Sequence, residues 1–284
     1  MNALILIAIF ALAGCTAKPQ AESQKLDVVV TTYFLEEFAR EVGKDKVEVR
    51  SILPGGTNPH SFEPSPVEMT TIQSADIFIY NGAGLEPYVG KIRFENTTVV
   101  EASAKLNLEK DEEHGGYDPH VWLDPTMAAK QVEVIAEAFS KVDPQNSDYY
   151  RQNAQKYIAE LLALDNEIEI EVKNFKKKGY IGFHPSFTYF NKKYGLEYYA
   201  VVEEFAGDEP SAGELAKLVR IAREKNVSAI FAEPFLDSRA AQVIAKEIGA
   251  EVLYLDTMHS KTNLSKGYIQ TMRYNLQQLG KELG

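Results

Sequence analysis

Three histidines and one aspartate recur along the chain at long and similar intervals. They are His60, His120, His184 and Asp256, and the steps between them are 60, 64 and 72 residues. Neutral imidazole nitrogens and a carboxylate oxygen together form a four-ligand set that suits zinc, which proteins usually hold tetrahedrally. Imidazole also suits copper, nickel and iron, whereas manganese prefers more oxygen ligands. The residue types therefore predict a site for a transition-metal ion, with zinc as the first choice.

A proline stands next to each of the three histidines. Proline fixes its own backbone torsion and restricts that of the residue before it, which lowers the entropic cost of presenting a ligand. A single histidine beside a proline is more often an ordinary loop residue. The prediction of a metal site depends on three such histidines occurring at equivalent places.

Most of the candidate ligands follow an apolar, strand-like run. Residues 47–53 lead to His60, residues 179–183 to His184 and residues 252–255 to Asp256, whereas His120 lies further from its nearest run at residues 97–100. In an open α/β sheet, ligands bind outside the carboxyl ends of the strands. Groups that are distant in sequence are therefore expected to meet at such an edge.

Strand-like and helical stretches alternate in both halves of the chain, which predicts parallel sheets covered by helices. The expected strands are residues 27–32, 47–53, 76–80 and 97–100, then 180–183, 197–202, 227–232 and 251–255. The expected helices are residues 34–42, 66–74 and 124–140, then 211–225, 238–248 and 265–279. Two of them begin with a capping box, Ser65 with Glu68 and Ser211 with Glu214.

One long helix is expected between the two halves. Residues 147–175 keep apolar residues at helical spacing without an interrupting glycine or proline. At about 1.5 Å per residue such a helix is roughly 43 Å long, which is enough to lie across two lobes.

The N-terminus predicts export and lipidation. Residues 3–14 form an uncharged apolar run that is too short to span a bilayer and has the size of a signal-peptide core. The run ends in Leu12-Ala-Gly-Cys15, which resembles a bacterial lipobox. Cys15 is the only cysteine, so it cannot form an internal disulfide, and lipidation gives this residue a role. Residues 16–25 are polar and are expected to tether the folded part to the membrane.

The composition is that of an ordinary globular protein, with 45% hydrophobic and 25% charged residues. About 260 residues remain after the predicted signal and tether, which is enough for two domains. The formal net charge of -11 disfavours nucleic acid as a partner.

Four segments in this order resemble the metal-binding lipoproteins of ABC importers, cluster A-I. They are Gly56-Thr-Asn-Pro-His-Ser-Phe-Glu-Pro64, Asp118-Pro-His-Val-Trp-Leu-Asp-Pro125, Gly182-Phe-His-Pro-Ser-Phe-Thr-Tyr-Phe190 and Leu255-Asp256. The resemblance implies an α/β fold of two similar lobes, each with a four-stranded parallel sheet, joined by one long helix with the metal in the cleft between them. The corresponding domains are a signal peptide (1–14), a lipidated Cys15 with its tether (15–25), an N-terminal lobe (26–143), a linking helix (144–178) and a C-terminal lobe (179–284).

The resemblance also implies a function. His60, His120, His184 and Asp256 match the family's four ligand positions, and manganese-type members usually carry glutamate at the position of His184, which favours zinc. The expected protein is a monomeric, extracytoplasmic zinc-binding component that delivers Zn²⁺ to a permease served by an ATPase. It would perform no chemical step.

Other functions remain as alternatives. An importer component for manganese or iron would keep the fold and change the ion. A zinc hydrolase would leave one metal position open and use Glu203, Glu204 or Glu233 as general base, but no His-Glu-x-x-His segment is present. A surface adhesin with an incidental metal ion is the third alternative.

Several residues around the predicted ligands are candidates for supporting roles. A metal-bound histidine usually donates its other ring hydrogen to a carboxylate or a carbonyl, and the candidates are Glu63, Asp118, Asp124, Glu203 and Glu233. The acidic segment 109–116 contains His114, the only counterpart of the histidine-rich loop of some zinc members. His259 is expected to be an exposed loop residue, with a substitute ligand in an open state as the alternative.

Overall fold

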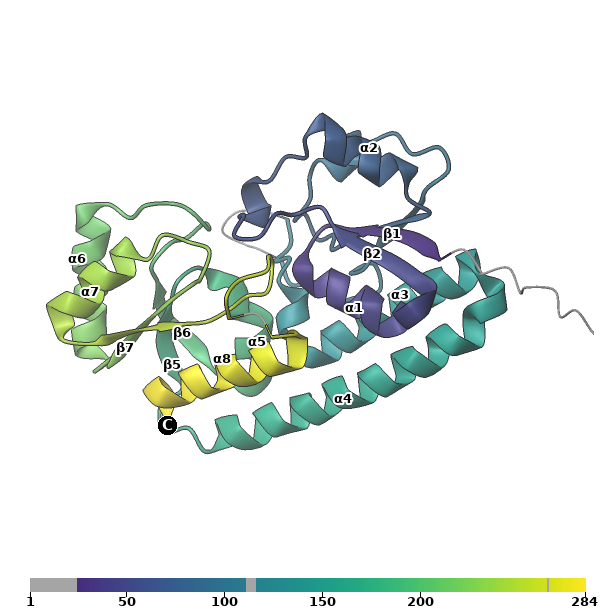
Figure 1. Cartoon of the computed structure of the whole chain (residues 1–284). Coiled ribbons are helices and arrows are strands. Elements are labelled where there is room, and N and C mark those ends of the chain that lie inside the picture. The colour runs from purple at the N-terminus through teal and green to yellow at the C-terminus, as the bar shows by residue number, and fades with distance from the viewer. Residues whose placement is uncertain (1–24, 111–115, 265) are drawn as a thin grey trace, which may run out of the picture.

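The computed structural model describes residues 25–110, 116–264 and 266–284. Within them the strands form two four-stranded parallel sheets, one in each lobe (Figure 1). The N-terminal sheet has the order β2-β1-β3-β4 and the C-terminal sheet the order β6-β5-β7-β8. The strands are β1 (Leu26–Val30), β2 (Val47–Ser51), β3 (Ile77–Tyr80), β4 (Thr98–Glu101), β5 (Gly179–Gly182), β6 (Glu197–Val201), β7 (Ala229–Ala232) and β8 (Glu251–Tyr254). All eight predicted strands are confirmed.

Helices cover both faces of the N-terminal sheet, which explains why its central strands are apolar without alternation. Val28 and Val30 of β1 pack into a core with α1 (Tyr33–Gly43) and α3 (Pro125–Val142), whereas Val29 faces the opposite core with α2 (Pro66–Ser74). The capping box predicted at the start of α2 is present, since Ser65 and Glu68 exchange both hydrogen bonds.

The C-terminal sheet is covered in the same way. Ile181 and Ile230 pack with α6 (Ala212–Glu224) and α7 (Arg239–Ile248), whereas Tyr180 and Phe231 face α8 (Tyr268–Leu283). The second predicted capping box, between Ser211 and Glu214, is also present.

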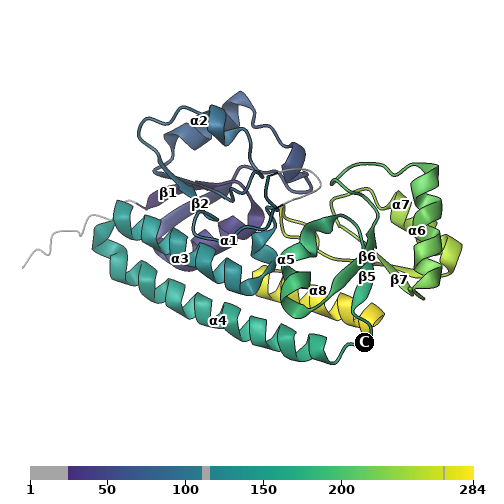
Figure 2. The same cartoon turned by 180° about the vertical axis from the view of Figure 1, so that it is seen from behind.

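The long helix predicted between the halves is α4 (Ser147–Lys173), and its 27 residues make it about 40 Å long. It packs against α3 and α1 of the N-terminal half and against α5 (Thr188–Tyr194) and α8 of the C-terminal half. Figure 2 shows α3 and α4 side by side along the lower edge of the molecule. Buried residues of both lobes and of α4 belong to one continuous core, so the relative placement of the lobes is part of the packing.

Some boundaries differ from the sequence-based expectation. The last helix begins at Tyr268 instead of residue 265 and continues to Leu283. The sequence does not predict the short helix α5, because its seven residues lie between Pro185 and Gly195 and resemble a loop. In the structure the helix ends at Gly195, which has a left-handed backbone conformation. Short 3-10 helices are η1 (Lys44–Lys46), η2 (Pro59–Ser61), η3 (Val89–Lys91), η4 (Val121–Leu123), η5 (Pro144–Asn146) and η6 (Pro185–Phe187).

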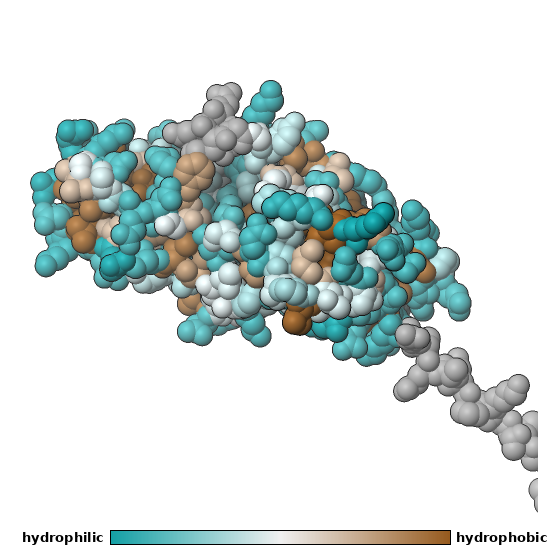
Figure 3. Space-filling model, turned by 90° about the horizontal axis from the view of Figure 1, so that it is seen from above, coloured by the Kyte–Doolittle hydropathy of each residue, from teal (hydrophilic) through white to brown (hydrophobic). Residues whose placement is uncertain are grey.

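The surface seen from above is mostly hydrophilic, with hydrophobic residues in small scattered groups (Figure 3). No helix in the described part of the chain combines the length and apolar character needed to cross a membrane. Cys15 and His114, for which the sequence suggested lipidation and metal recruitment, lie outside the described residues.

Candidate metal centre

The three candidate histidines come together because each follows the carboxyl end of a parallel strand. His60 lies in η2 after β2, His120 comes just before η4 in the connection after β4, and His184 lies between β5 and η6. The turn at His60 is fixed by Asn58, whose side chain accepts a hydrogen bond from the His60 backbone N–H at 3.0 Å. This turn fixes where the backbone presents the His60 side chain.

The imidazoles converge on one point. One ligand atom from each of His60, His120 and His184 can be chosen so that all three lie within 4.8 Å of one another. The Nε2 atom of His120 is 3.2 Å from Nε2 of His60 and 3.2 Å from Nε2 of His184. Two nitrogens on one tetrahedral zinc ion are separated by about 3.3 Å, given Zn–N distances of about 2.0–2.1 Å. The spacing of these three nitrogens fits such an ion.

Buried carboxylates fix the tautomers of two of the rings. Asp118 Oδ1 lies 2.7 Å from Nδ1 of His120, and Glu233 Oε1 is hydrogen-bonded to Nδ1 of His184. Since an ionised carboxylate only accepts, both Nδ1 atoms donate and both Nε2 atoms of the neutral rings carry lone pairs. Lone pairs 3.2 Å apart repel each other. A cation between them removes this repulsion, which is the chemical reason to regard the group as a metal site.

The surroundings of His60 keep its ring neutral. Although the residue is partly exposed to solvent, its pKa lies well below the ordinary value. The main cause is desolvation by the surrounding protein, and electrostatic repulsion between a protonated His60 and the neighbouring imidazoles of His120 and His184 adds to it. A neutral imidazole is the form that binds a metal ion.

The three histidines line a cleft of about 1000 Å³ between the lobes. Its walls include Ala83 and Tyr117 from the N-terminal half and Phe205 from the C-terminal half. Side chains from both lobes therefore border the path between solvent and the imidazoles.

Asp256 is placed differently from the three histidines. Its carboxylate is buried, Oδ1 accepts from the backbone N–H of Met258 at 2.8 Å, and Oδ2 accepts from the Thr262 hydroxyl at 2.8 Å. Among the described residues the group of converging ligand atoms comprises the histidines without Asp256. Its assignment as a ligand therefore stays a prediction, and in this structure the carboxylate holds the turn of its own loop.

His259 is not the exposed loop residue expected from sequence. It is fully buried, and its ring lies 5.5 Å from that of His60 and 5.4 Å from that of His120, measured between centroids. The expectation was wrong because contacts from the other lobe bury the loop. The backbone N–H of Tyr33 donates to the His259 carbonyl at 2.9 Å, and the Trp122 ring lies 4.8 Å away. Such contacts leave no local pattern in the sequence.

Of the five carboxylates considered as partners of the histidines, Asp118 and Glu233 contact an imidazole. Asp124 instead caps α3 and pairs with Lys193 at 3.0 Å. Glu63 is exposed and lies 3.9 Å from Lys91.

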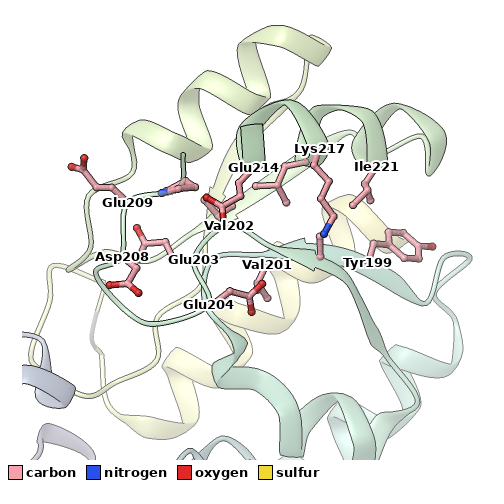
Figure 4. A pocket seen from close by; sticks show the side chains of 13 residues that line it. Tyr199, Val201, Val202, Glu203, Glu204, Asp208, Glu209, Glu214, Lys217 and Ile221 are labelled. Atoms are coloured by element: carbon pink, nitrogen blue, oxygen red, sulfur yellow. The ribbon is translucent and has the colours of Figure 1, made fainter. Parts of the chain in front are cut away.

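Glu203 and Glu204 border another pocket, of about 450 Å³, between β6 and α6 (Figure 4). Glu203 accepts a hydrogen bond from the Gly207 backbone N–H at 2.7 Å, and its pKa is raised to about 7, first of all by burial. Glu204 also borders the cleft of the three histidines. Glu233 uses one oxygen for His184 and the other for the Thr257 hydroxyl, which makes it a support for an imidazole.

Comparison with known proteins identifies the family. The model of a family described as zinc-uptake complex component A, periplasmic, matches residues 28–282. The chain belongs to this family. The resemblance to metal-binding lipoproteins inferred from the sequence motifs is thereby confirmed, as is the predicted fold class.

Several members of this zinc-uptake family are closely similar over nearly the whole chain. The high-affinity zinc uptake system protein ZnuA of Bacillus subtilis (strain 168) is 36% identical over 298 aligned positions, covering 97% of this chain and 93% of the relative. The solved Zn(II)-bound ZnuA-like domain of Streptococcus pneumoniae AdcA has a TM-score of 0.82 at 30% identity and covers 91% of this chain and 99% of that chain.

The structure of the laminin-binding protein of Streptococcus agalactiae, described as an adhesin with metal transporting activity, has a TM-score of 0.85 at 31% identity. This match covers 92% of the present chain and 100% of that chain.

Proposed function

We propose that this protein captures zinc outside the cytoplasm and delivers the ion to the permease of an ABC importer. The observation that carries the proposal is the convergence of the Nε2 atoms of His60, His120 and His184, two of them held as lone-pair donors by Asp118 and Glu233. Membership of the zinc-uptake family supports the same ion and the same role.

The donor atoms support zinc over manganese. The converging group among the described residues consists of three imidazoles without a carboxylate oxygen, whereas manganese prefers oxygen ligands. A manganese or iron importer component remains the alternative, since a 28% identical relative from Halalkalibacterium halodurans is named a manganese-binding lipoprotein.

The proposed role includes no catalysis. Glu233, one of the residues considered as a general base, is engaged with His184 and Thr257, and the family comprises solute-binding components of metal transporters. Adhesion is a second candidate function, which the likeness to the laminin-binding protein of Streptococcus agalactiae favours. It would be tested by binding of the purified protein to immobilised laminin.

The remaining features of the proposal complete the transport role. The signal segment 1–14 would be removed, Cys15 would carry lipid, and residues 15–25 would tether a monomeric folded part to the membrane. The N-terminal lobe (26–143), linking helix (144–178) and C-terminal lobe (179–284) would present the loaded cleft to a permease with its ATPase.

Growth in zinc-limited medium tests this function. Deletion of the gene should reduce zinc uptake by cells, and the wild-type gene should restore it, whereas His120→Ala should not. Glu63→Gln, which changes an exposed carboxylate beside Lys91, serves as the comparison. If the deletion leaves zinc uptake unchanged and lowers manganese uptake, the transported ion is manganese and not zinc.

A further inference from the structure

His259 has a buried nitrogen that no described residue engages. Its side chain is fully buried, and its Nε2 atom has no hydrogen-bond partner among the described residues. Buried polar atoms are almost always paired, so an orphaned atom of this kind requires an explanation. The unpaired nitrogen belongs to a ring that faces the three converging histidines.

The hydrogen bonds of Thr257 fix the tautomer of His259. The Thr257 hydroxyl lies 3.2 Å from Glu233 Oε2 and 2.8 Å from Nδ1 of His259. A hydroxyl has one hydrogen, and an ionised carboxylate only accepts. Thr257 therefore donates to Glu233 and accepts from the Nδ1–H of His259, which leaves the lone pair on Nε2. The same carboxylate also accepts from Nδ1 of His184. Glu233 therefore orients the His184 ring directly and the His259 ring through Thr257.

The four rings are arranged like the ligands of one tetrahedral ion. Four imidazoles bound to one zinc through Nε2 have ring centroids about 5 Å apart, given Zn–N distances of about 2.0–2.1 Å. The centroid distances among His60, His120 and His184 are 5.1, 5.7 and 5.0 Å. Those from His259 to the same three rings are 5.5, 5.4 and 6.2 Å. The arrangement is slightly open on the His259 side, which is why His259 is absent from the tightest group of ligand atoms.

The loop that carries His259 is built to turn it inward. Met258 has a left-handed backbone with φ of 59°, and its N–H is held by the Asp256 carboxylate. Thr257 is tied to the other lobe, because Trp122 Nε1 donates to its carbonyl at 2.7 Å. Asp256 thus shapes the turn that presents the next histidine.

We propose that His259 is a fourth zinc ligand in place of Asp256, and that Thr257 and Glu233 are the positioning residues that hold its ring in the metal-binding tautomer. The inference rests on the proposed zinc-binding function and deepens it. A site of four neutral imidazoles has no oxygen donor and no open position. It therefore favours zinc over manganese and leaves no bound water to activate.

X-ray absorption at the zinc edge counts imidazole ligands and tests the inference on the full chain purified in mild detergent and loaded with one equivalent of zinc. We expect four imidazoles in the wild type and in Asp256→Asn, and three in His259→Phe, whose ring fills the space without a nitrogen. Glu63→Gln, which changes an exposed carboxylate beside Lys91, is the control and should keep four. Three imidazoles with an oxygen donor in the wild type, or four imidazoles in His259→Phe, would overturn the assignment.

Competitive zinc titration tests the positioning residue and does not depend on whether His259→Phe folds. Loss of a supporting hydrogen bond typically lowers metal affinity by about 10–100-fold. We expect this loss in Thr257→Val, which keeps the shape and removes the hydroxyl, and recovery in Thr257→Ser. Equal affinities of the valine and serine variants would show that the Thr257 hydroxyl does not position the His259 ring. A wild-type protein that binds no zinc would instead refute the proposed function, whereas one zinc on three imidazoles would refute only this inference.

Discussion

The lowered pKa of His60 makes the stability of the zinc-free protein depend on pH. Desolvation, together with electrostatic repulsion from the neighbouring imidazoles of His120 and His184, holds the pKa of this imidazole well below the ordinary value of about 6.5. In zinc-free protein we therefore expect the NMR signals of the His60 ring to titrate with a midpoint below 6.5. The unfolded chain takes up its proton first as the pH falls, so His60 also lowers the free energy of unfolding below about pH 6.5. A midpoint at or above the value measured in denaturant would contradict the described environment.

Asp118 and Glu63 offer a matched pair of carboxylates. Asp118 contacts Nδ1 of His120 at 2.7 Å, whereas Glu63 is exposed and lies beside Lys91, with no contact to a histidine among the described residues. We expect Asp118→Asn to weaken zinc binding by about 10–100-fold, because an amide holds the ring and its tautomer less firmly. Glu63→Gln should leave the affinity unchanged in the same chelator competition. Equal affinities for the two variants would show that Asp118 does not orient the ligand.

Residue types and spacing predict the position of His184 but not that of His259. His184 was predicted because it follows an apolar run and precedes a proline, and the structure brings it to the centre of the group. His259 is expected from the sequence to be exposed, but contacts with residues far away in sequence, such as Tyr33 and Trp122, bury it. The role of Asp256 as a cap for its own turn likewise depends on backbone geometry that residue spacing does not reveal.

Packing around the end of β5 requires a glycine at position 182. A Cβ atom at Gly182 would lie 2.5 Å from the Tyr198 ring, whose hydroxyl accepts from the Phe187 backbone N–H. The ring cannot yield without disturbing η6, which follows His184. We expect Gly182→Ala to destabilise the protein by about 1–3 kcal/mol in urea unfolding and to weaken zinc binding.

Gly213 in α6 provides the control for Gly182. The nearest atom to a Cβ there is Ser211 Oγ at 3.9 Å, so an added methyl group meets no obstacle. Alanine is the better helix former, and Gly213→Ala should stabilise the protein by about 0.4–1 kcal/mol. A stabilising Gly182→Ala would contradict the packing described for β5.

The sequence predicts the helices and strands better than the contacts between them. All eight strands and both capping boxes follow from local patterns of apolar residues and from cap residues. The helix α5 escaped prediction because its seven residues are too few for a periodic pattern. The connection that carries His120 follows β4 by many residues, and its position became clear only from contacts such as the hydrogen bond from Tyr189 Oη to the Asp118 carbonyl, 2.8 Å long.

At the scale of the whole molecule, the lobes share one hydrophobic core that includes Leu161 of α4 and Leu279 of α8. We therefore expect thermal unfolding of zinc-free protein to show one cooperative transition, monitored by calorimetry. Zinc should raise its midpoint, since a ligand at 100 times its Kd stabilises the native state by about 2.7 kcal/mol. Two separate transitions would indicate that the lobes unfold independently.

We infer that His60, His120 and His184 form a site that holds zinc in preference to manganese. The most direct test is elemental analysis of the purified, dialysed protein, followed by competitive titration with zinc and manganese. We expect one zinc ion per chain that excess manganese does not displace, with affinity reduced by orders of magnitude in His184→Ala. Preferential retention of manganese, or zinc binding that is unchanged in His184→Ala, would contradict this inference.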